Sequence, residues 1–293
     1  MQNILITEKS KDYELLDSGE GEKLERYGRV ILRRPDLQAI WEKSLPKEEW
    51  EKSDAVFTRT GTAGKWKKSK EINDTWNVSL EELVFELQLL PSKHLGLFPE
   101  QGVQWKWLEE KVKSRKLKVE SEKIKVLNLF GYTGGASLAC SKAGAEVCHV
   151  DSSKFSVDLA NINMKLSGLQ DNKIRFIVDD VRKFVEREIK RGVKYDVVLL
   201  DPPVYGKGVK KEVWKIEEDL LPLLKRIKQI LSPNPLAVVL NGYSSGYSSV
   251  TYKQALETLT EDLKGEVSCG ELAIKESSRG RLLTSGIFAR WEN

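Results

Sequence analysis

Cysteine and histidine are scarce in this chain of 293 residues, which has three cysteines and two histidines. Cys140, Cys148 and Cys269 are scattered and form no Cys-x-x-Cys pair, so neither a disulfide framework nor a zinc site is expected. With only His94 and His149, a histidine-rich metal centre is excluded. The cysteines are therefore interpreted as small apolar side chains in a reducing compartment, and no metal is expected.

Long apolar runs are also absent, which excludes a helix able to span a bilayer. The opening MQNILITEKSKDYELL holds only a short apolar stretch that meets charge at Glu8 and Lys9, unlike a signal peptide. A soluble, cytoplasmic protein with no membrane partner is therefore expected. The net charge of +4 permits nucleic-acid binding but does not by itself argue for it.

Three segments of the chain differ in their residue composition and hydrophobic pattern. Residues 1–90 combine glycine turns with strand-like runs at 29–33 and 55–59, which predicts a small β-rich module. Residues 91–122 are predicted to form a bridge with a helix from Gln104 to about Lys113. Residues 123–293 are predicted to form the main domain.

Strand-like and helix-like segments alternate from residue 123 onward. Strands are predicted at 125–130, 145–151, 173–180, 195–201, 236–240, 267–275 and 282–291. Helices are predicted at 135–143, 153–166, 181–190, 213–231 and 250–263. This alternation predicts an α/β fold with a Rossmann-like, seven-stranded sheet, mostly parallel, with its last strand antiparallel.

Ligands of open α/β sheets bind beyond the carboxyl ends of the strands, so the residues there are the candidates for a site. The first strand is followed by Gly131-Tyr132-Thr133-Gly134-Gly135. Glycines allow close approach of the backbone to a ligand, and the next helix N-terminus favours a carboxylate or phosphate. The full G-x-G-x-x-G pattern is missing, which disfavours a nicotinamide dinucleotide. A purely steric glycine turn is the alternative.

Acidic residues follow the second and third strands. Asp151 can accept two hydrogen bonds from a ribose diol, or it can cap the helix that begins near Ser153. Of Asp179 and Asp180, one can accept from an adenine amino group while the other caps the helix that begins at Val181. Asp180 is favoured as the ligand.

The fourth strand ends in Asp201-Pro202-Pro203-Val204-Tyr205, the most specific motif in the chain. Two prolines make a stiff loop with few free donors, which can aim a carboxylate and backbone carbonyls at a nucleophile. Transfer of a methyl group from a sulfonium needs in-line approach of the nucleophile and a route for its proton. An ordinary proline turn is the alternative.

Several motifs, in order, resemble those of the RlmI/RlmK-type ribosomal RNA methyltransferases, which are class I enzymes dependent on S-adenosylmethionine (SAM). The motifs are VLNLFGYTGG (126–135), VDSSK (150–154), DDVRKF (179–184), YDVVLLDPP (195–203) and GLFPEQ (96–101). The segments GELAIKE (270–276) and RLLTSGIFARW (281–291) are similar to a bacterial subgroup that lacks the N-terminal PUA RNA-binding domain. The resemblance covers roughly residues 91–293.

This resemblance implies roles for the residues at the strand ends. Asp151 would hold the ribose, Asp180 the adenine, and Asp201–Pro203 would flank the acceptor, with Tyr205 beside them. Gln101 would close the pocket from outside. The remaining residues expected to contact SAM are Phe130, Gly131, Tyr132, Thr133, Gly134, Gly135, Ser152, Ser153 and Val181.

Two departures from the family pattern bear on the acceptor. Members that make 5-methylcytosine resemble one another in a cysteine after the fifth strand, where this chain has residues 241–246, NGYSSG. Methylation of cytosine C5 needs a thiolate adduct, so a nitrogen or oxygen acceptor is favoured here. Val204 stands where the family commonly has lysine.

The resemblance implies RNA, and ribosomal RNA first, as the acceptor, and basic clusters in the sequence are compatible with it. They lie at 65–70 (KWKKSK), 111–118 and 207–211, and such clusters can follow phosphates and stack a base. A solvated surface is the alternative for each. Two other functions stay open: a methyltransferase for a small molecule or protein, and a non-catalytic module that binds SAM or RNA.

Overall fold

The computed structural model describes residues 3–60, 63–118, 123–208, 212–243 and 246–293, which form two compact units. The first unit comprises residues 3–5, Gln104–Glu271 and Gly286–Asn293. The second comprises Ile6–Val103 and Leu272–Ser285. The predicted division into a module (residues 1–90), a bridge (91–122) and a main domain (123–293) stays a prediction.

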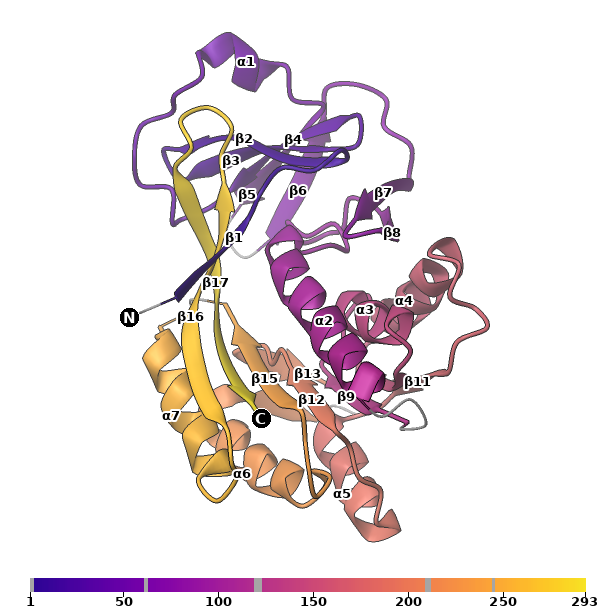
Figure 1. The fold of residues 1–293 in the computed structure, drawn as a ribbon. Coiled ribbons are helices and arrows are strands. Elements are labelled where there is room, and N and C mark those ends of the chain that lie inside the picture. The colour runs from indigo at the N-terminus through magenta and orange to yellow at the C-terminus, as the bar shows by residue number, and fades with distance from the viewer. Residues whose placement is uncertain (1–2, 61–62, 119–122, 209–211, 244–245) are drawn as a thin grey trace. The chain divides into compact units, whose positions relative to one another are not determined.

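The first unit is built on a mostly parallel sheet (Figure 1). In the described residues, the strand order is β1 (Asn3–Thr7), β16 (Glu266–Lys275), β17 (Leu282–Glu292), β15 (Ala237–Gly242), β12 (Val197–Leu200), β9 (Lys125–Leu129), β10 (Glu146–Asp151) and β11 (Ile174–Val178). Strands β9 to β12 and β15 pair in parallel, whereas β17 is antiparallel to β15. The predicted fold class is confirmed. Strand β1 adds an edge strand that was not predicted, because five residues are too few to show a clear periodicity.

Helices cover both faces of this sheet because its strands are apolar on both sides. On β9, Val126 packs with Leu108 of α2 (Gly102–Lys118), whereas the adjacent Leu127 packs in the opposite layer. That opposite layer consists of α5 (Val181–Arg191), α6 (Ile216–Lys228) and α7 (Ser249–Thr260). Helix α3 (Gly135–Lys142) lies on the α2 face, and α4 (Lys154–Leu166) contacts β10 and β11.

A hairpin precedes α6, where the sequence predicted continuous helix from Val213. Strands β13 (Tyr205–Lys207) and β14 (Val213–Lys215) pair antiparallel, so the predicted start of this helix is wrong. Val213 has the spacing of a helical core position but lies in an extended strand. The Trp214 indole N–H donates to the Pro203 carbonyl, and the Ile216 amide donates to the Val204 carbonyl, which keeps this segment beside the proline loop.

The second unit is β-rich, as predicted. Its sheet has the order β2 (Tyr13–Gly19), β3 (Glu22–Tyr27), β4 (Val30–Pro35), β5 (Ala55–Thr60) and β6 (Ala63–Lys68). The unit also contains the hairpin β7 (Trp76–Leu80) and β8 (Leu83–Leu87), the short helix α1 (Lys47–Glu51) and the 3-10 helix η1 (Pro99–Gln101). No helix in the described ranges has the length and apolarity needed to cross a membrane.

A buried ion pair lies in the core of the second unit. The Glu25 carboxylate accepts hydrogen bonds from Arg34 Nε at 2.9 Å and from the hydroxyls of Tyr13 and Tyr27 at 3.0 and 3.1 Å. Burial by itself would raise the pKa of Glu25, but Arg34 and Lys23 outweigh it and lower the pKa to about 2.

Candidate active site

The strand order reverses between β9 and β12, which places the loop after β9 at the point where this fold binds ligands. In this loop Phe130, Tyr132 and Gly134 all have positive φ, at 57°, 48° and 95°. Left-handed conformations are strained for residues other than glycine, and such strain concentrates at functional sites. The loop then enters α3 with Gly134 at its N-cap and no side-chain capping bond.

A buried polar cluster supports the loop from below. A Cβ atom added to Gly131 would lie 2.5 Å from Cε1 of His149, so no larger residue fits there unless the ring moves. Nδ1 of His149 is 3.0 Å from the hydroxyl of Ser137, which also accepts a hydrogen bond from Asn128. Burial lowers the pKa of His149 to about 4, so the ring is neutral near pH 7.

Close packing also explains the last glycine of the loop. A Cβ atom on Gly135 would lie 2.1 Å from Trp105, which packs against the start of α3. Asn163 of α4 donates to the carbonyl of Thr133 at 2.9 Å. Residues of α2 and α4 thus hold the loop at Gly135 and Thr133.

Asp151 connects the loop to the end of β10. Its two carboxylate oxygens accept hydrogen bonds from the backbone amides of Tyr132 at 2.9 Å and Ser153 at 2.8 Å. Ser153, rather than Asp151, caps α4 through a hydrogen bond from Ser156 N, so the capping alternative for Asp151 is wrong. A carboxylate has about four lone-pair sites, so Asp151 keeps capacity for further donors. Burial raises its pKa, and the two backbone bonds partly oppose that shift.

Asp180 is both the N-cap of α5 and one member of an ion pair. Its carboxylate accepts from the amides of Arg182 and Lys183, and it pairs with the Arg182 guanidinium at 2.7 Å. Burial alone would raise the pKa of Asp180, but the bonds from Arg182 and Lys183 lower it. Asp179 instead pairs with Arg187, so the helix cap falls on the residue that the sequence favoured as a ligand.

A cavity of about 80 Å³ gathers residues from four strand ends. Five of the predicted site residues line it together with Trp214: Phe130, Ser152, Asp180, Val181 and Pro203. The Trp214 ring lies edge-on to Phe130 at 4.8 Å, and its N–H donates to the Pro203 carbonyl at 2.7 Å. The cavity thus has aromatic and aliphatic walls together with the Ser152 hydroxyl and the charged side chains of Asp180, Lys207 and Glu212.

Asp201 begins the proline loop directly after β12. Its amide donates to the Leu129 carbonyl at 3.4 Å, which brings it beside the end of β9. Pro202 is buried and Pro203 is exposed. Tyr205 is 55% exposed in the β13–β14 hairpin, and the described contacts do not bring it into the small cavity.

The end of β15 lies close to the proline loop. Strand β15 pairs in parallel with β12 up to Leu240 and Leu200, so the two strand ends are adjacent. Burial raises the pKa of Tyr252, and the Asp201 charge raises it further. A Cβ atom on Gly242 would lie 2.3 Å from the Tyr252 hydroxyl. The Tyr252 hydroxyl therefore fills the space beside Gly242, near the start of the stretch where related enzymes place a cysteine. Residues 244–245 of that stretch lie outside the described part of the chain.

A polar chain supports the same strand end. Gln104 Nε2 donates to Asn241 Oδ1 at 2.8 Å, and Arg290 Nε donates to Gln104 Oε1. Arg290 is buried, lies over the Trp107 ring at 4.3 Å, and has a pKa that burial lowers to about 10. The hydrogen bond from Gln104 therefore fixes the orientation of the Asn241 side chain at the edge of the candidate site.

Gln101 belongs to the second unit, where it is buried in η1, and its role at the pocket stays a prediction. In the basic clusters, Trp66 is a packing residue: it contacts Phe57 at 5.3 Å and donates to the Leu90 carbonyl at 2.8 Å. Lysines of the 111–118 cluster are mostly engaged, Lys113 with Glu109 and Lys116 with the Gly144 carbonyl. Residues 209–211 of the third cluster lie outside the described residues.

The sequence interpretation missed the residues that buttress the site. Trp214 was assigned to a helix, although Tyr205–Lys207 and Val213–Lys215 flank a glycine and could have suggested a hairpin. Trp105, His149 and Asn163 had no signal at all, because their roles depend on neighbours distant in sequence.

Known proteins similar to this chain point to one family. The sequence model of the S-adenosylmethionine-dependent methyltransferases matches residues 31–257. The crystal structure of the SAM-dependent methyltransferase from Agrobacterium tumefaciens is similar at 39% identity and a TM-score of 0.93, covering 99% of this chain and 93% of that one. The chain therefore belongs to the S-adenosylmethionine-dependent methyltransferase family, and it is an enzyme of that class.

Curated relatives match shorter segments. Ribosomal RNA large subunit methyltransferase I of Aeromonas salmonicida is 41% identical over 85 residues, which is 29% of this chain and 22% of that protein. Ribosomal RNA large subunit methyltransferase K/L of Shewanella baltica is 30% identical over 179 residues, which is 60% of this chain and 23% of that protein. The chain thus spans less than a quarter of either relative, and the predicted resemblance to the RlmI/RlmK type is confirmed at the level of the family.

The residues present fit the cofactor of the family. The strained glycine loop leaves no room for larger side chains, the half-buried Asp151 keeps acceptor capacity, and the cavity beside Phe130 and Trp214 combines apolar rings with polar side chains. SAM supplies a methyl group on a positively charged sulfur, and the chain has to orient that group and exclude water from it.

Proposed function

We propose that this enzyme transfers the methyl group of SAM to a nitrogen or oxygen of RNA, and most specifically of ribosomal RNA. The curated relatives named above are ribosomal RNA methyltransferases, and this similarity is the observation that carries the proposal. A small-molecule or protein acceptor is the competing assignment. The cytoplasmic location expected from the sequence is kept as part of the same proposal.

In this proposal the glycine loop and the two strand-end aspartates hold the cofactor. The amides after Phe130 and at the start of α3 receive the methionine carboxylate, since α3 has no side-chain cap. Asp151 accepts from the ribose hydroxyls with its remaining lone pairs. Asp180 accepts from the adenine amino group, while Val181 and Trp214 pack against the purine ring.

The proline loop is proposed to hold the acceptor. Asp201 lies where β12 ends, and its carboxylate would take the proton that a nitrogen or oxygen nucleophile loses on methylation. Pro202 and Pro203 stiffen this corner, and Asn241 would bind the acceptor from the next strand end. Absence of a cysteine from residues 241–246 supports a nitrogen or oxygen acceptor over cytosine C5.

The decisive test is mass spectrometry of RNA nucleosides from cells with and without the gene. Loss of one methylated nucleoside, restored by the purified enzyme and labelled SAM, is the expected result. Label transferred only to protein or to small molecules in the same extracts would replace RNA as the acceptor.

A further inference from the structure

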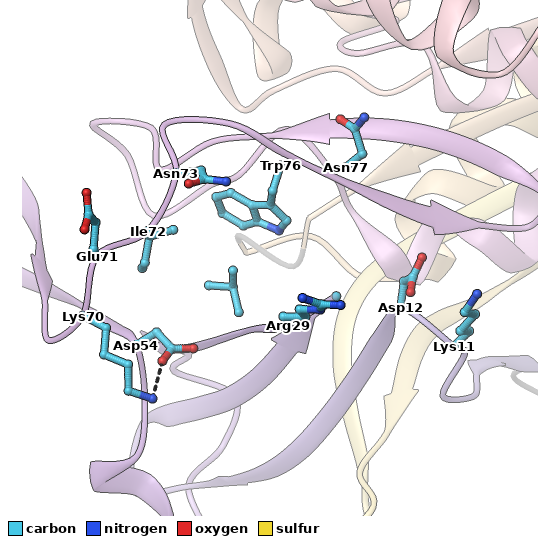
Figure 2. Close-up of a pocket in the computed structure, with 12 residues that line it drawn as sticks. Lys11, Asp12, Arg29, Asp54, Lys70, Glu71, Ile72, Asn73, Trp76 and Asn77 are labelled. Carbon is cyan, nitrogen blue, oxygen red and sulfur yellow. Dashed lines mark ion pairs between the residues drawn. The ribbon is translucent and has the colours of Figure 1, made fainter.

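The second unit contains a cavity of about 690 Å³ that the proposed methyl transfer does not use (Figure 2). Its walls come from the turn before β4, the segment after β6 and the start of β7. A volume of this size lies within the range of small-molecule pockets. Every lining residue belongs to the second unit, so the cavity is a feature of that unit alone.

One wall of the cavity is apolar and contains an aromatic ring. Val30, Ile72 and Trp76 supply this wall. Nε1 of Trp76 is shielded from solvent and has no hydrogen-bond partner in the described residues, and Figure 2 shows it on the side of the ring that faces Arg29. An indole face at a cavity wall suits stacking with a nucleobase.

The acidic residues of the cavity are largely engaged by the fold itself. Asp12 accepts from the Ser79 amide at 2.9 Å. Asp54 accepts from the Ile31 amide at 2.8 Å and forms an ion pair with Lys70 at 2.9 Å. The charge of Asp54 is thereby balanced by Lys70, whereas Asp12 keeps its negative charge, which Lys11 and Arg29 of the same lining offset.

Cations remain at the rim. Lys11 and Arg29 are exposed and have no carboxylate partner within the described ranges. The exposed Glu71 is a further acid of the lining, and the side chains of Asn73 and Asn77, which also line the cavity, offer amide donors and acceptors. The guanidinium and ammonium groups suit a phosphate, the amides suit the edge of a base, and the aromatic wall suits the face of a base.

A row of lysines leads away from the cavity. Lys65 and Lys67 are exposed on β6, which is the edge strand of its sheet, and the chain continues from there to Lys70 at the cavity. Trp66, between them, packs inward, so this row can follow a phosphate backbone but does not stack a base.

We propose that this cavity binds one nucleotide of single-stranded RNA, with the base against Trp76 and the phosphate at Arg29 and Lys11. The proposal rests on RNA being the acceptor and adds a site that recognises it away from the chemistry. Free mononucleotides share this chemistry but lack the neighbouring phosphates that Lys65 and Lys67 would contact, so they are expected to bind far more weakly.

The test measures binding of labelled single-stranded oligoribonucleotides of about ten nucleotides to the full chain by fluorescence anisotropy at several salt concentrations, with AMP and UMP as competitors. Trp76→Ala is expected to weaken binding roughly tenfold or more, whereas Trp76→Phe, which keeps a ring, retains most of it. Arg29→Gln is expected to weaken binding and to lower the slope of log K against log salt by about one. Lys52→Gln, an exposed lysine of the same unit outside the cavity, should bind like the parent.

Unchanged SAM affinity and circular dichroism show that each variant is folded. If the parent binds and methylates RNA while Trp76→Ala and Arg29→Gln stay within about twofold of it, this site is wrong and RNA methylation stands. If the parent binds no RNA and labels only protein or small molecules, both proposals fail. Mononucleotides that compete as well as the oligonucleotide would also overturn the proposal, because the cavity would then be a free-nucleotide site.

Discussion

At the scale of single residues, the two aspartates that follow β10 and β12 have different surroundings. Asp151 is half-buried, and its carboxylate accepts hydrogen bonds from the backbone amides of Tyr132 and Ser153. Asp201 is half-buried at a proline corner and close to Tyr252. The first environment suits a fixed acceptor for a ligand, and the second suits a group that meets an incoming acceptor.

Substitution of Asp151 tests the cofactor role. Asp151→Ala is expected to weaken SAM binding by about 1–3 kcal/mol, because hydrogen bonds to a buried ligand are lost. Isothermal titration calorimetry measures this, with Asp158→Ala on the exposed face of α4 as a matched control. The same affinity in both variants would remove Asp151 from the site.

Substitution of Asp201 separates binding from chemistry. Asp201→Ala is expected to reduce methyl transfer by roughly 100-fold or more, the range for loss of a proton acceptor, while SAM affinity changes little. Single-turnover transfer from labelled SAM and calorimetry on the same preparation give the two numbers. Normal turnover would assign this loop a scaffolding role only.

At the scale of elements, the loop after β9 is held by packing as much as by hydrogen bonds. Gly131 lies over His149 and Gly135 over Trp105, and neither position has room for a side chain. The β13–β14 hairpin closes the cavity through Trp214, which holds Phe130 and Pro203 at once. The shape of the site therefore depends on side chains of α2, β10 and the β13–β14 hairpin that pack around the loop.

A small overpacking substitution tests this support. Gly131→Ala is expected to destabilise the fold by about 1–3 kcal/mol and to weaken SAM binding, because the new methyl group displaces the buried His149 ring. Chemical denaturation and calorimetry measure both effects. Gly102→Ala, where a Cβ meets nothing closer than 3.4 Å, is the control. Full SAM affinity in Gly131→Ala would mean that the loop adapts without His149.

At the scale of the whole molecule, both units have apolar cores, and the second also buries an ion pair. The first has continuous apolar layers on both faces of its sheet. The second buries the Glu25–Arg34 ion pair with two tyrosine hydroxyls. Acid is therefore expected to affect the second unit through this carboxylate.

The pH dependence follows from the depressed pKa of Glu25. With a pKa of about 2 in the folded chain and an ordinary value of 4.5, its contribution to stability is fully present above pH 4.5 and is lost as pH falls toward 2. The lost contribution is on the order of 3 kcal/mol. Denaturation from pH 4.5 downward should show this slope in the parent and a shallower one in Glu25→Gln, whose stability is lower throughout because Arg34 loses its charged partner. Parallel slopes would exclude Glu25 as the cause.

Alternating apolar segments and the residues that follow them were sufficient to predict the parallel sheet, its antiparallel last strand and the cluster of Phe130, Ser152, Asp180, Val181 and Pro203. These features are predictable because strand period and strand ends are local properties of the chain, and parallel strands bring their ends to one edge. The β13–β14 hairpin was not predicted. The three-residue spacing of Val213 and Ile216 fits one continuous helix, and it fits equally well a strand that ends just before a helix.

The amino-acid sequence by itself thus determined the fold class, the family and the candidate residues at the strand ends. Tertiary structure decided which of them cap helices, as Asp180 does, and which packing residues stand behind them, as His149, Trp105 and Trp214 do. It also showed that Trp66 packs inward while Trp76 lines a cavity. The reason is physical: strand period and the residues at strand ends are encoded locally, whereas burial and contact depend on which distant segments the fold brings together.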